Sequence, residues 1–167
     1  FSSAAAQTMK MNEPLVPGGD VLDAELAYGR LIYLADQDRN DEFELYMVPA
    51  DASTGPRRLN GTRPVGADTL DDYRNSVKFS PDGAWVVYRA DEHLPGVFEL
   101  FSVPADGSAA PVKLNAPLVG ERDVELQPLF QFTPDSRFVL YCADQEQDQH
   151  VELFRVPIDG SGPAIVL

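Results

Sequence analysis

Residues 77–115 read VKFSPDGAWVVYRADEHLPGVFELFSVPADGSAAPVKLN and decide the fold of this 167-residue chain. Runs of β-branched and aromatic residues, such as 85–88 (WVVY), alternate in it with turn residues at 81–83 (PDG) and 105–108 (ADGS). Such runs favour β-strands, and proline, aspartate and glycine favour the tight turns that join them. The stretch therefore predicts four short antiparallel strands, at residues 77–79, 85–88, 98–103 and 112–114.

The same pattern recurs before and after this stretch. Three tyrosines, Tyr33, Tyr88 and Tyr141, lie 55 and 53 residues apart, and an aspartate follows each of them after three residues. Glu-Leu and Val-Pro pairs keep these two spacings, starting at Glu44, Glu99 and Glu152 and at Val48, Val103 and Val156. A fixed period of about 54 residues predicts a stacked or circular array of equivalent units.

We divide the chain into a short N-terminal segment and three repeats. Residues 1–11 are expected to end a preceding repeat or to form an N-terminal arm, and the repeats cover residues 12–60, 61–115 and 116–167. The first repeat is trimmed, with 13 residues from Asp20 to Tyr33 where the second has 20 from Asp68 to Tyr88. We therefore expect its opening hairpin to be reduced to residues 26–31.

The first twelve residues have two interpretations. Phe1 followed by small residues resembles the end of a secretory signal, with cleavage after Ala6. Alternatively, residues 3–12 (SAAAQTMKMN) align with residues 107–115 (GSAAPVKLN) and end the last strand of a preceding repeat. The second interpretation explains more positions, and it predicts a fragment, a processed product or part of a larger protein.

Two of the predicted strands, residues 85–88 (WVVY) and 138–141 (FVLY), are apolar at successive positions. Because alternate residues of a strand point to opposite faces, both faces of these strands must be covered. Four-stranded antiparallel sheets cover one another in this way when they repeat radially. The fold expected is all-β, a β-propeller-type array of three four-stranded antiparallel blades, either a partial propeller or part of a larger ring.

Two stretches carry a resemblance to a known family. Residues 79–83 (FSPDG) before 85–88, and residues 132–136 (FTPDS) before 138–141, are similar to the WD40-like PD40 repeats of TolB-type β-propellers. The resemblance continues through the Glu-Leu-aromatic strand and the Asp-Gly-Ser turn and covers nearly the whole chain, although the first repeat lacks Ser-Pro-Asp-Gly. It implies a bacterial exported or periplasmic protein, whose propeller is a platform for protein interaction or accompanies a hydrolase domain.

Composition argues against nucleic-acid binding, a membrane span and internal disulfide bonds. The chain has 27 acidic and 13 basic residues, a formal charge of −14 and no basic stripe, so nucleic-acid binding is not expected. No apolar run approaches the roughly 18 residues that a membrane span needs. The single Cys142 excludes an internal disulfide framework.

Three blades leave apolar surface to be covered. Propellers close with about four to eight blades, and an open array exposes an apolar sheet face at each end. We expect these faces to be covered by further blades of a longer chain, by a second copy or by a different protein subunit. A self-closed three-bladed monomer is the least favoured arrangement.

The loop after the first tyrosine is the candidate metal site. Asp36, Asp38 and Asn40 place side-chain oxygens at alternate positions, which lets a short loop wrap a calcium ion. The sixth position of such a loop, usually glycine, is Asp41, and the twelfth is Met47 rather than glutamate. The alternative is a solvated acidic loop without a cofactor.

Other polar residues repeat with the period and are expected to be structural. An aspartate at the start of each loop is expected to accept backbone N–H bonds, and a glutamate in each third strand to form a hydrogen bond or ion pair between blades. These residues are Asp36, Asp91 and Asp144, and Glu44, Glu99 and Glu152. His93 and His150 are expected on the surface, and Cys142 is expected to be buried.

No catalytic or cofactor-binding residue is assigned, because neither a Gly-x-Ser-x-Gly elbow nor a glycine-rich phosphate loop occurs in the sequence. We expect a non-catalytic protein-interaction module, a propeller segment that acts as a scaffold or accessory subunit. Two alternatives stay open: an accessory propeller of a peptidase or other hydrolase whose catalytic domain lies outside this chain, and a calcium-dependent surface-binding protein. The acidic composition and the family resemblance favour a periplasmic or extracellular location.

Overall fold

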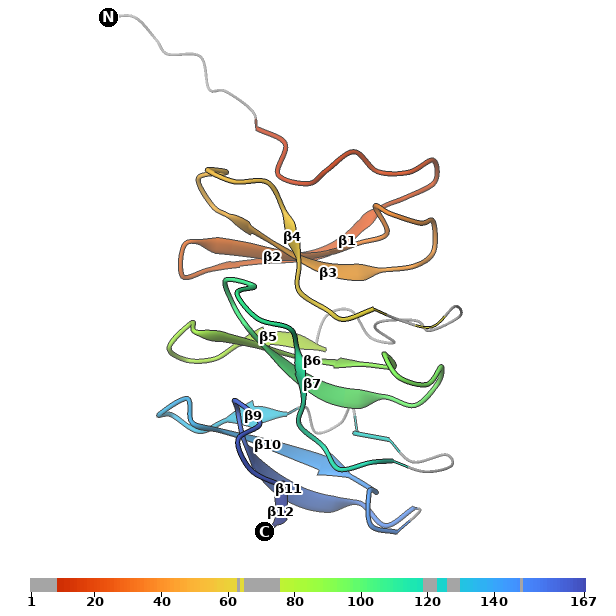
Figure 1. The fold of residues 1–167 in the computed structure, drawn as a ribbon, viewed down its shortest axis with the longest axis vertical. Coiled ribbons are helices and arrows are strands. Elements are labelled where there is room, and N and C mark those ends of the chain that lie inside the picture. Colours follow the sequence, from red (N-terminus) through yellow and green to blue (C-terminus); the bar gives the residue numbers. More distant parts are fainter. Residues whose placement is uncertain (1–8, 63, 65–75, 119–122, 126–129, 148) are drawn as a thin grey trace, which may run out of the picture.

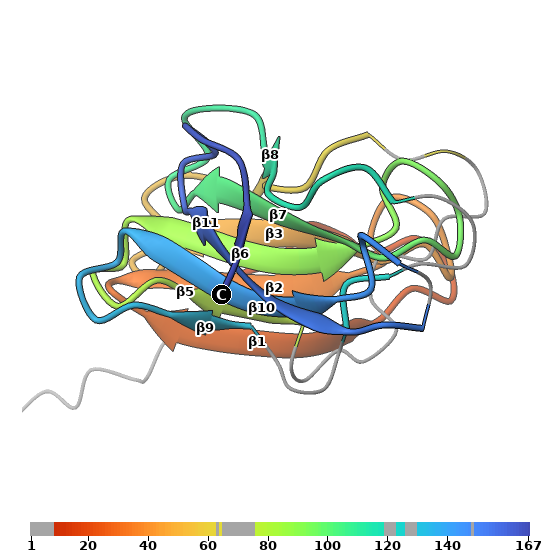
Figure 2. The same ribbon diagram turned by 90° about the horizontal axis from the view of Figure 1, so that it is seen from below.

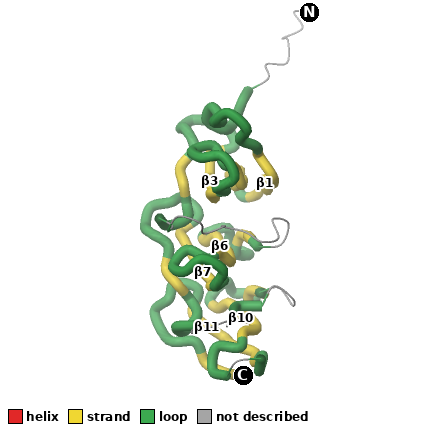
Figure 3. Tube along the Cα trace, turned by 90° about the vertical axis from the view of Figure 1, so that its right-hand side faces the viewer, coloured by secondary structure: helices red, strands yellow, loops and turns green. Residues whose placement is uncertain are grey.

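The computed structural model describes residues 9–62, 64, 76–118, 123–125, 130–147 and 149–167. Within these residues the chain forms three four-stranded antiparallel sheets, stacked one on another, and no helix (Figures 1 and 3). We call the sheets blade 1, blade 2 and blade 3 in chain order. The all-β fold expected from the repeats, with three four-stranded blades, is confirmed.

Each blade is built from four consecutive strands. Blade 1 contains β1 (Val21–Ala27), β2 (Arg30–Ala35), β3 (Glu44–Pro49) and β4 (Arg57–Arg58). Blade 2 contains β5 (Val77–Phe79), β6 (Trp85–Ala90), β7 (Glu99–Pro104) and β8 (Val112–Lys113). Blade 3 contains β9 (Gln131–Phe132), β10 (Phe138–Ala143), β11 (Glu152–Pro157) and β12 (Ile165–Val166). Sequence neighbours therefore pair in space throughout, as short antiparallel connections require.

The opening hairpin of blade 1 is longer than the sequence suggested. β1 has seven residues and pairs with β2 along its length, so the expected reduction to residues 26–31 is wrong. Tyr28 and Gly29 form the turn with φ of 50° and 72°, and two left-handed residues make a tight two-residue connection. The Tyr28 ring lies edge-on to Phe79 of blade 2, and its hydroxyl donates to the carbonyl of Pro81 at 2.8 Å.

Side chains fix the equivalent turn of blade 2 and join it to blade 3. The Ser80 hydroxyl donates to Asp82 Oδ1 at 2.5 Å and accepts from the N–H of Trp85 at 3.0 Å. The N–H of Asp82 donates to the Ser136 hydroxyl of the next blade at 3.0 Å. Together with the Tyr28 bond, this contact links all three blades along the edge where these turns lie.

Two apolar cores lie between the blades, and one small cluster lies outside blade 1. The core between blades 1 and 2 includes Leu45, Leu59, Tyr88 and Phe101. The core between blades 2 and 3 includes Leu100, Leu114, Tyr141 and Phe154. The outer cluster contains Tyr33 and Tyr46, against which Met11 and Leu15 pack. Figure 1 shows the segment before β1 running over this outer side of blade 1.

The middle sheet and the last sheet differ in how they are covered. Val87 and Tyr88, successive residues of β6, have no exposed surface, so the expectation of two covered faces is confirmed for this strand. In β10 the buried Val139 and Tyr141 alternate with partly exposed neighbours, so the described residues cover only one face of this strand and the covering of its second face stays a prediction. Blade 3 has a described sheet on one side only, which leaves its second face open.

Candidate functional site

Each blade has an aromatic face. It carries two stacked rings, one from the second strand and one from the third, with centroids 5.4 Å apart: Tyr33 with Tyr46, Tyr88 with Phe101, and Tyr141 with Phe154. In blades 2 and 3 this face packs against the preceding blade. In blade 1 it forms the cluster that Met11 and Leu15 contact.

The opposite side of each blade is a leucine face. Leu45 of blade 1 and Leu100 of blade 2 lie at equivalent positions of the third strand, and both are buried against the following blade. Leu153 takes this position in blade 3 and is 44% exposed, whereas Leu100 has no exposed surface. The fourth-strand position repeats the contrast, since Leu167 is 60% exposed and Leu114 is 4% exposed.

β10 contributes to the same face of blade 3. Leu140 and Cys142 alternate with the buried side of the strand and are both partly exposed. The expectation that Cys142 is buried is therefore wrong, because no described sheet lies over it. Its partial burial still raises the pKa of the Cys142 thiol, and the charge of Glu125 raises it further. We call Leu140, Cys142, Leu153 and Leu167 the open face; Figure 2 views the molecule from this end.

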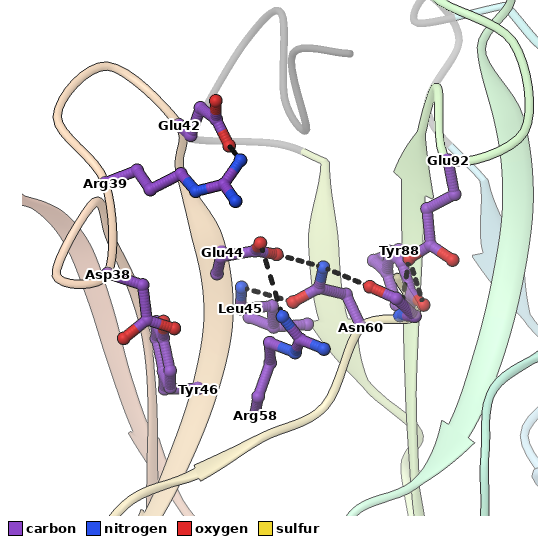
Figure 4. Close-up of polar contacts among 11 residues, drawn as sticks. Asp38, Arg39, Glu42, Glu44, Leu45, Tyr46, Arg58, Asn60, Tyr88 and Glu92 are labelled. Atoms are coloured by element: carbon purple, nitrogen blue, oxygen red, sulfur yellow. Dashed lines mark hydrogen bonds and ion pairs between the residues drawn. The ribbon is translucent and has the colours of Figure 1, made fainter. Parts of the chain in front are cut away.

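Two of the recurring glutamates, Glu44 and Glu99, form ion pairs within a blade. Glu44 forms an ion pair with Arg58 at 3.5 Å and accepts a hydrogen bond from the Asn60 amide (Figure 4). Glu99 forms the equivalent ion pair with Lys113 at 2.7 Å. These contacts join the third and fourth strands of one sheet, so the expectation of a bond between blades is wrong for Glu99, whose partners His93 and Lys113 both lie in blade 2. The register of each β-hairpin brings the pair together.

Two asparagines that the sequence analysis did not single out complete this arrangement. Asn60 Oδ1 accepts the N–H of Leu45 at 2.8 Å, and Asn115 Oδ1 accepts the N–H of Leu100 at 2.8 Å. Both asparagines are buried. The sequence signal was a repeated triplet of a cation, leucine and asparagine, at residues 58–60 and 113–115.

A hydroxyl and a loop side chain form another repeated contact. The Tyr88 hydroxyl donates to Glu92 Oε1 at 2.7 Å, and the N–H of Gly61 donates to the same oxygen at 3.0 Å. Burial raises the pKa of Glu92, these two bonds oppose the rise, and the charge of Glu44 adds to it. In the other blades a glutamine takes this place: Gln37 accepts from Tyr33 at 3.3 Å and Gln145 from Tyr141 at 3.0 Å.

The recurring aspartates hold the loops after the second strands. In each loop the carboxylate accepts the backbone N–H of the residue five positions later: Asp36 from Asp41 at 2.9 Å, Asp91 from Gly96 at 2.9 Å and Asp144 from Gln149 at 3.2 Å. All three carboxylates belong to buried residues. The structural role expected for them is confirmed.

The three candidate calcium ligands lie in one loop and have protein partners. Asp36 accepts backbone N–H bonds from Asp20 and Asp41, and Asp38 Oδ2 accepts from the Tyr46 hydroxyl at 3.0 Å. The Asn40 amide donates to Asp41 Oδ2 at 2.6 Å. Among the described residues, no group of three or more histidine, cysteine, aspartate or glutamate side chains is placed to hold a metal ion. Calcium binding here stays a prediction, which titration calorimetry on chelator-treated protein tests.

The histidines lie at the surface, as expected. His150 is exposed, and the His93 side chain is 58% exposed. His93 Nδ1 lies 2.5 Å from the Glu99 carboxylate, which also pairs with Lys113, in a cleft of about 620 Å³ between blades 1 and 2.

No helix long and apolar enough to cross a membrane occurs in the described part of the chain.

Comparisons with known proteins agree with the fold. No protein-family profile and no curated protein matches the sequence. The structure is similar to that of a TolB-type protein from Agrobacterium tumefaciens, with 20% identity and a TM-score of 0.51, over 80% of this chain and 40% of that chain. It is also similar to a structure from a study of two prolyl endopeptidases, with 16% identity and a TM-score of 0.59, over 90% of this chain and 20% of that chain.

These similarities define the class of fold. The chain spans less than half the length of each of these two proteins, and at such identities the likeness shows the fold alone. The sheets are therefore blades of a β-propeller. The narrower assignment to PD40 repeats stays a prediction from the sequence.

Proposed function

We propose that this chain is a non-catalytic interaction module, a propeller segment that acts as a scaffold or accessory subunit in a larger assembly. The observation that carries the proposal is the 44% exposure of Leu153, at a position where Leu45 and Leu100 are buried. An exposed apolar face of this kind marks a site of association. The expected partner is a further propeller blade with a stacked aromatic pair, because such pairs cover both equivalent leucine faces.

The recurring polar residues support a non-catalytic role. The aspartates hold loops, and the glutamates of blades 1 and 2 join neighbouring strands of one sheet. The fold thus accounts for these side chains, which repetition alone had singled out. The formal charge of −14 and the sequence resemblance support a periplasmic or extracellular location for the assembly.

Mass measurements on the naturally produced protein, under native and denaturing conditions, test this proposal. We expect a native particle with blades beyond these three, and we expect Leu153→Asp to weaken it by placing a charge in the covered face. The matched control is Leu26→Asp, which adds the same charge at a leucine of β1 that is 66% exposed. A stable, monodisperse 167-residue monomer that tolerates Leu153→Asp would refute the proposal.

The similarity to a prolyl endopeptidase structure favours a second candidate. In it, the chain is part of the accessory propeller of a peptidase or other hydrolase, whose catalytic domain lies elsewhere on the polypeptide. A serine-hydrolase probe applied to the natural polypeptide separates the two. A covalent adduct outside these 167 residues supports the second candidate, and an unlabelled polypeptide supports the first.

A further inference from the structure

The fourth strands of blades 1 and 2 make the same three contacts. Each carries a cation, a leucine and an asparagine in succession, residues 58–60 and 113–115. The cation pairs with the glutamate of the third strand, and the asparagine oxygen accepts the N–H of the leucine that follows this glutamate. The triplet's own leucine packs against the next blade.

The asparagines share a further bond that fixes their orientation. The Asn60 amide donates to the carbonyl of Gly61 at 3.1 Å, and the Asn115 amide donates to the carbonyl of Ala116 at 2.8 Å. With the amide nitrogen held by the following residue, the side-chain oxygen points back toward the third strand. A cation-Leu-Asn triplet in this conformation therefore pairs with a strand that contains Glu-Leu, through the ion pair to the glutamate and the hydrogen bond from the leucine N–H.

Residues 10–12 repeat the triplet at the other end of the molecule from the open face. Lys10, Met11 and Asn12 take the places of the cation, the leucine and the asparagine. Met11 packs against the aromatic face of blade 1, as the triplet leucines pack against blades 2 and 3. The Asn12 amide donates to the carbonyl of Glu13 at 2.8 Å, the same bond to the following residue. Within the described residues, no strand pairs with this segment.

We propose that residues 10–12 are the fourth strand of a further blade, which precedes blade 1 on the same polypeptide. The third strand of that blade reads Glu-Leu-aromatic. Its glutamate pairs with Lys10, and the N–H of its leucine donates to Asn12 Oδ1. The interface between residues 10–12 and this further blade lies at the opposite end of the molecule from the open face. The inference therefore goes beyond the proposed function and can be tested independently of it.

The spacing within the known blades assigns the partner strand to the same chain. In both complete cases the leucine lies 15 residues before its asparagine. A second copy of this chain is a poorer source, because its own Glu-Leu strands already have fourth strands. The Glu-Leu pair of β11 also has a fourth strand beside it, because β12 pairs with β11 even though Val166 takes the place of the cation there. The leucine sought therefore lies about 15 residues upstream of Asn12.

Peptide mapping and amide hydrogen exchange on the natural polypeptide test this assignment. We expect a Glu-Leu-aromatic sequence at that distance before Asn12, and we expect Asn12→Ala to accelerate exchange of the N–H of its leucine by about tenfold or more. Asn60→Ala should do the same for the N–H of Leu45, whereas Asn40→Ala, in an exposed loop, should leave both amides unchanged.

Three results would overturn the inference. The first is a natural polypeptide without Glu-Leu in this region. The second is an upstream leucine whose exchange Asn12→Ala leaves unchanged while Asn60→Ala accelerates that of Leu45. The third is a dimer that dissociates on Asn12→Ala, because it would place the partner strand on a second copy.

Discussion

Replacing one leucine at the same position of each blade by alanine separates covered faces from the open one. Leu45, Leu100 and Leu153 have exposed fractions of 1%, 0% and 44%. Truncating a buried leucine costs about 2–5 kcal/mol of unfolding free energy, through lost burial and the cavity that is left. We expect costs in this range at Leu45 and Leu100. Because nearly half of Leu153 is already in water and its truncation encloses no cavity, about half of the roughly 2 kcal/mol for burying a leucine, ~1 kcal/mol, is expected there.

Urea unfolding followed by tryptophan fluorescence measures these costs. Trp85 is the single tryptophan and packs, partly buried, against the core between blades 2 and 3. The control is Leu26→Ala, at a position that is 66% exposed, with an expected cost within about 0.5 kcal/mol. Equal costs at Leu153 and Leu100 in the isolated chain would refute the open face. In the proposed assembly, the cost at Leu153 should instead rise toward that at Leu100.

Three further outcomes are expected. Burial raises the pKa of Glu92 in the folded protein above its ordinary value of 4.5, so stability falls as the pH rises from 4.5 through that folded-state pKa. Glu92→Gln removes the buried charge and should therefore raise the melting temperature at pH 7. Below pH 4.5, where the Glu92 carboxyl is protonated in both states, calorimetry should show no change. Hydrogen bonds from Ser80 and its neighbours lower the pKa of Asp82 in the folded protein below 3.8. The ionised Asp82 therefore stabilises the fold above pH 3.8, and this contribution is lost as the pH falls through the folded-state pKa. The melting temperature of Asp82→Asn should accordingly fall less steeply with acidification than that of the unmodified protein. Asp36→Ala leaves the N–H of Asp41 without its acceptor and should cost about 1–3 kcal/mol by urea unfolding. A larger loss with calcium present than with a calcium chelator would assign Asp36 to a metal site, and an equal loss would leave it the structural role alone.

The repeats were predictable because their markers lie in elements set by local sequence. Glu-Leu and Val-Pro mark the third strand, and Asp-Gly-Ser marks the turn after it, so the period survives without knowledge of any contact. The open face was not predictable in this way. Leu100 and Leu153 are the same residue in similar strands, and their burial differs only because another blade lies beside one of them.

The partners of the recurring glutamates show a second limit. Arg58 lies 14 residues after Glu44 in the sequence, and only the register of β3 and β4, in which Tyr46 faces Arg58, brings the two charges together. The sequence suggested a bond between blades because repeat spacing does not distinguish contacts within a sheet from contacts between sheets. The length of β1 was missed for a related reason, since two left-handed turn residues shorten the connection rather than the strands.

The edge strands of the three sheets are short or irregular, which limits edge-to-edge pairing between molecules. β4, β8, β9 and β12 have two residues each and β5 has three, so these margins offer few unpaired backbone groups to a stray strand. The long margin, β1, carries Asp23 and Glu25 and is broken by a register irregularity after Val21. A molecule whose open face is exposed to solvent therefore offers few edge strands for continuous edge-to-edge pairing with other copies.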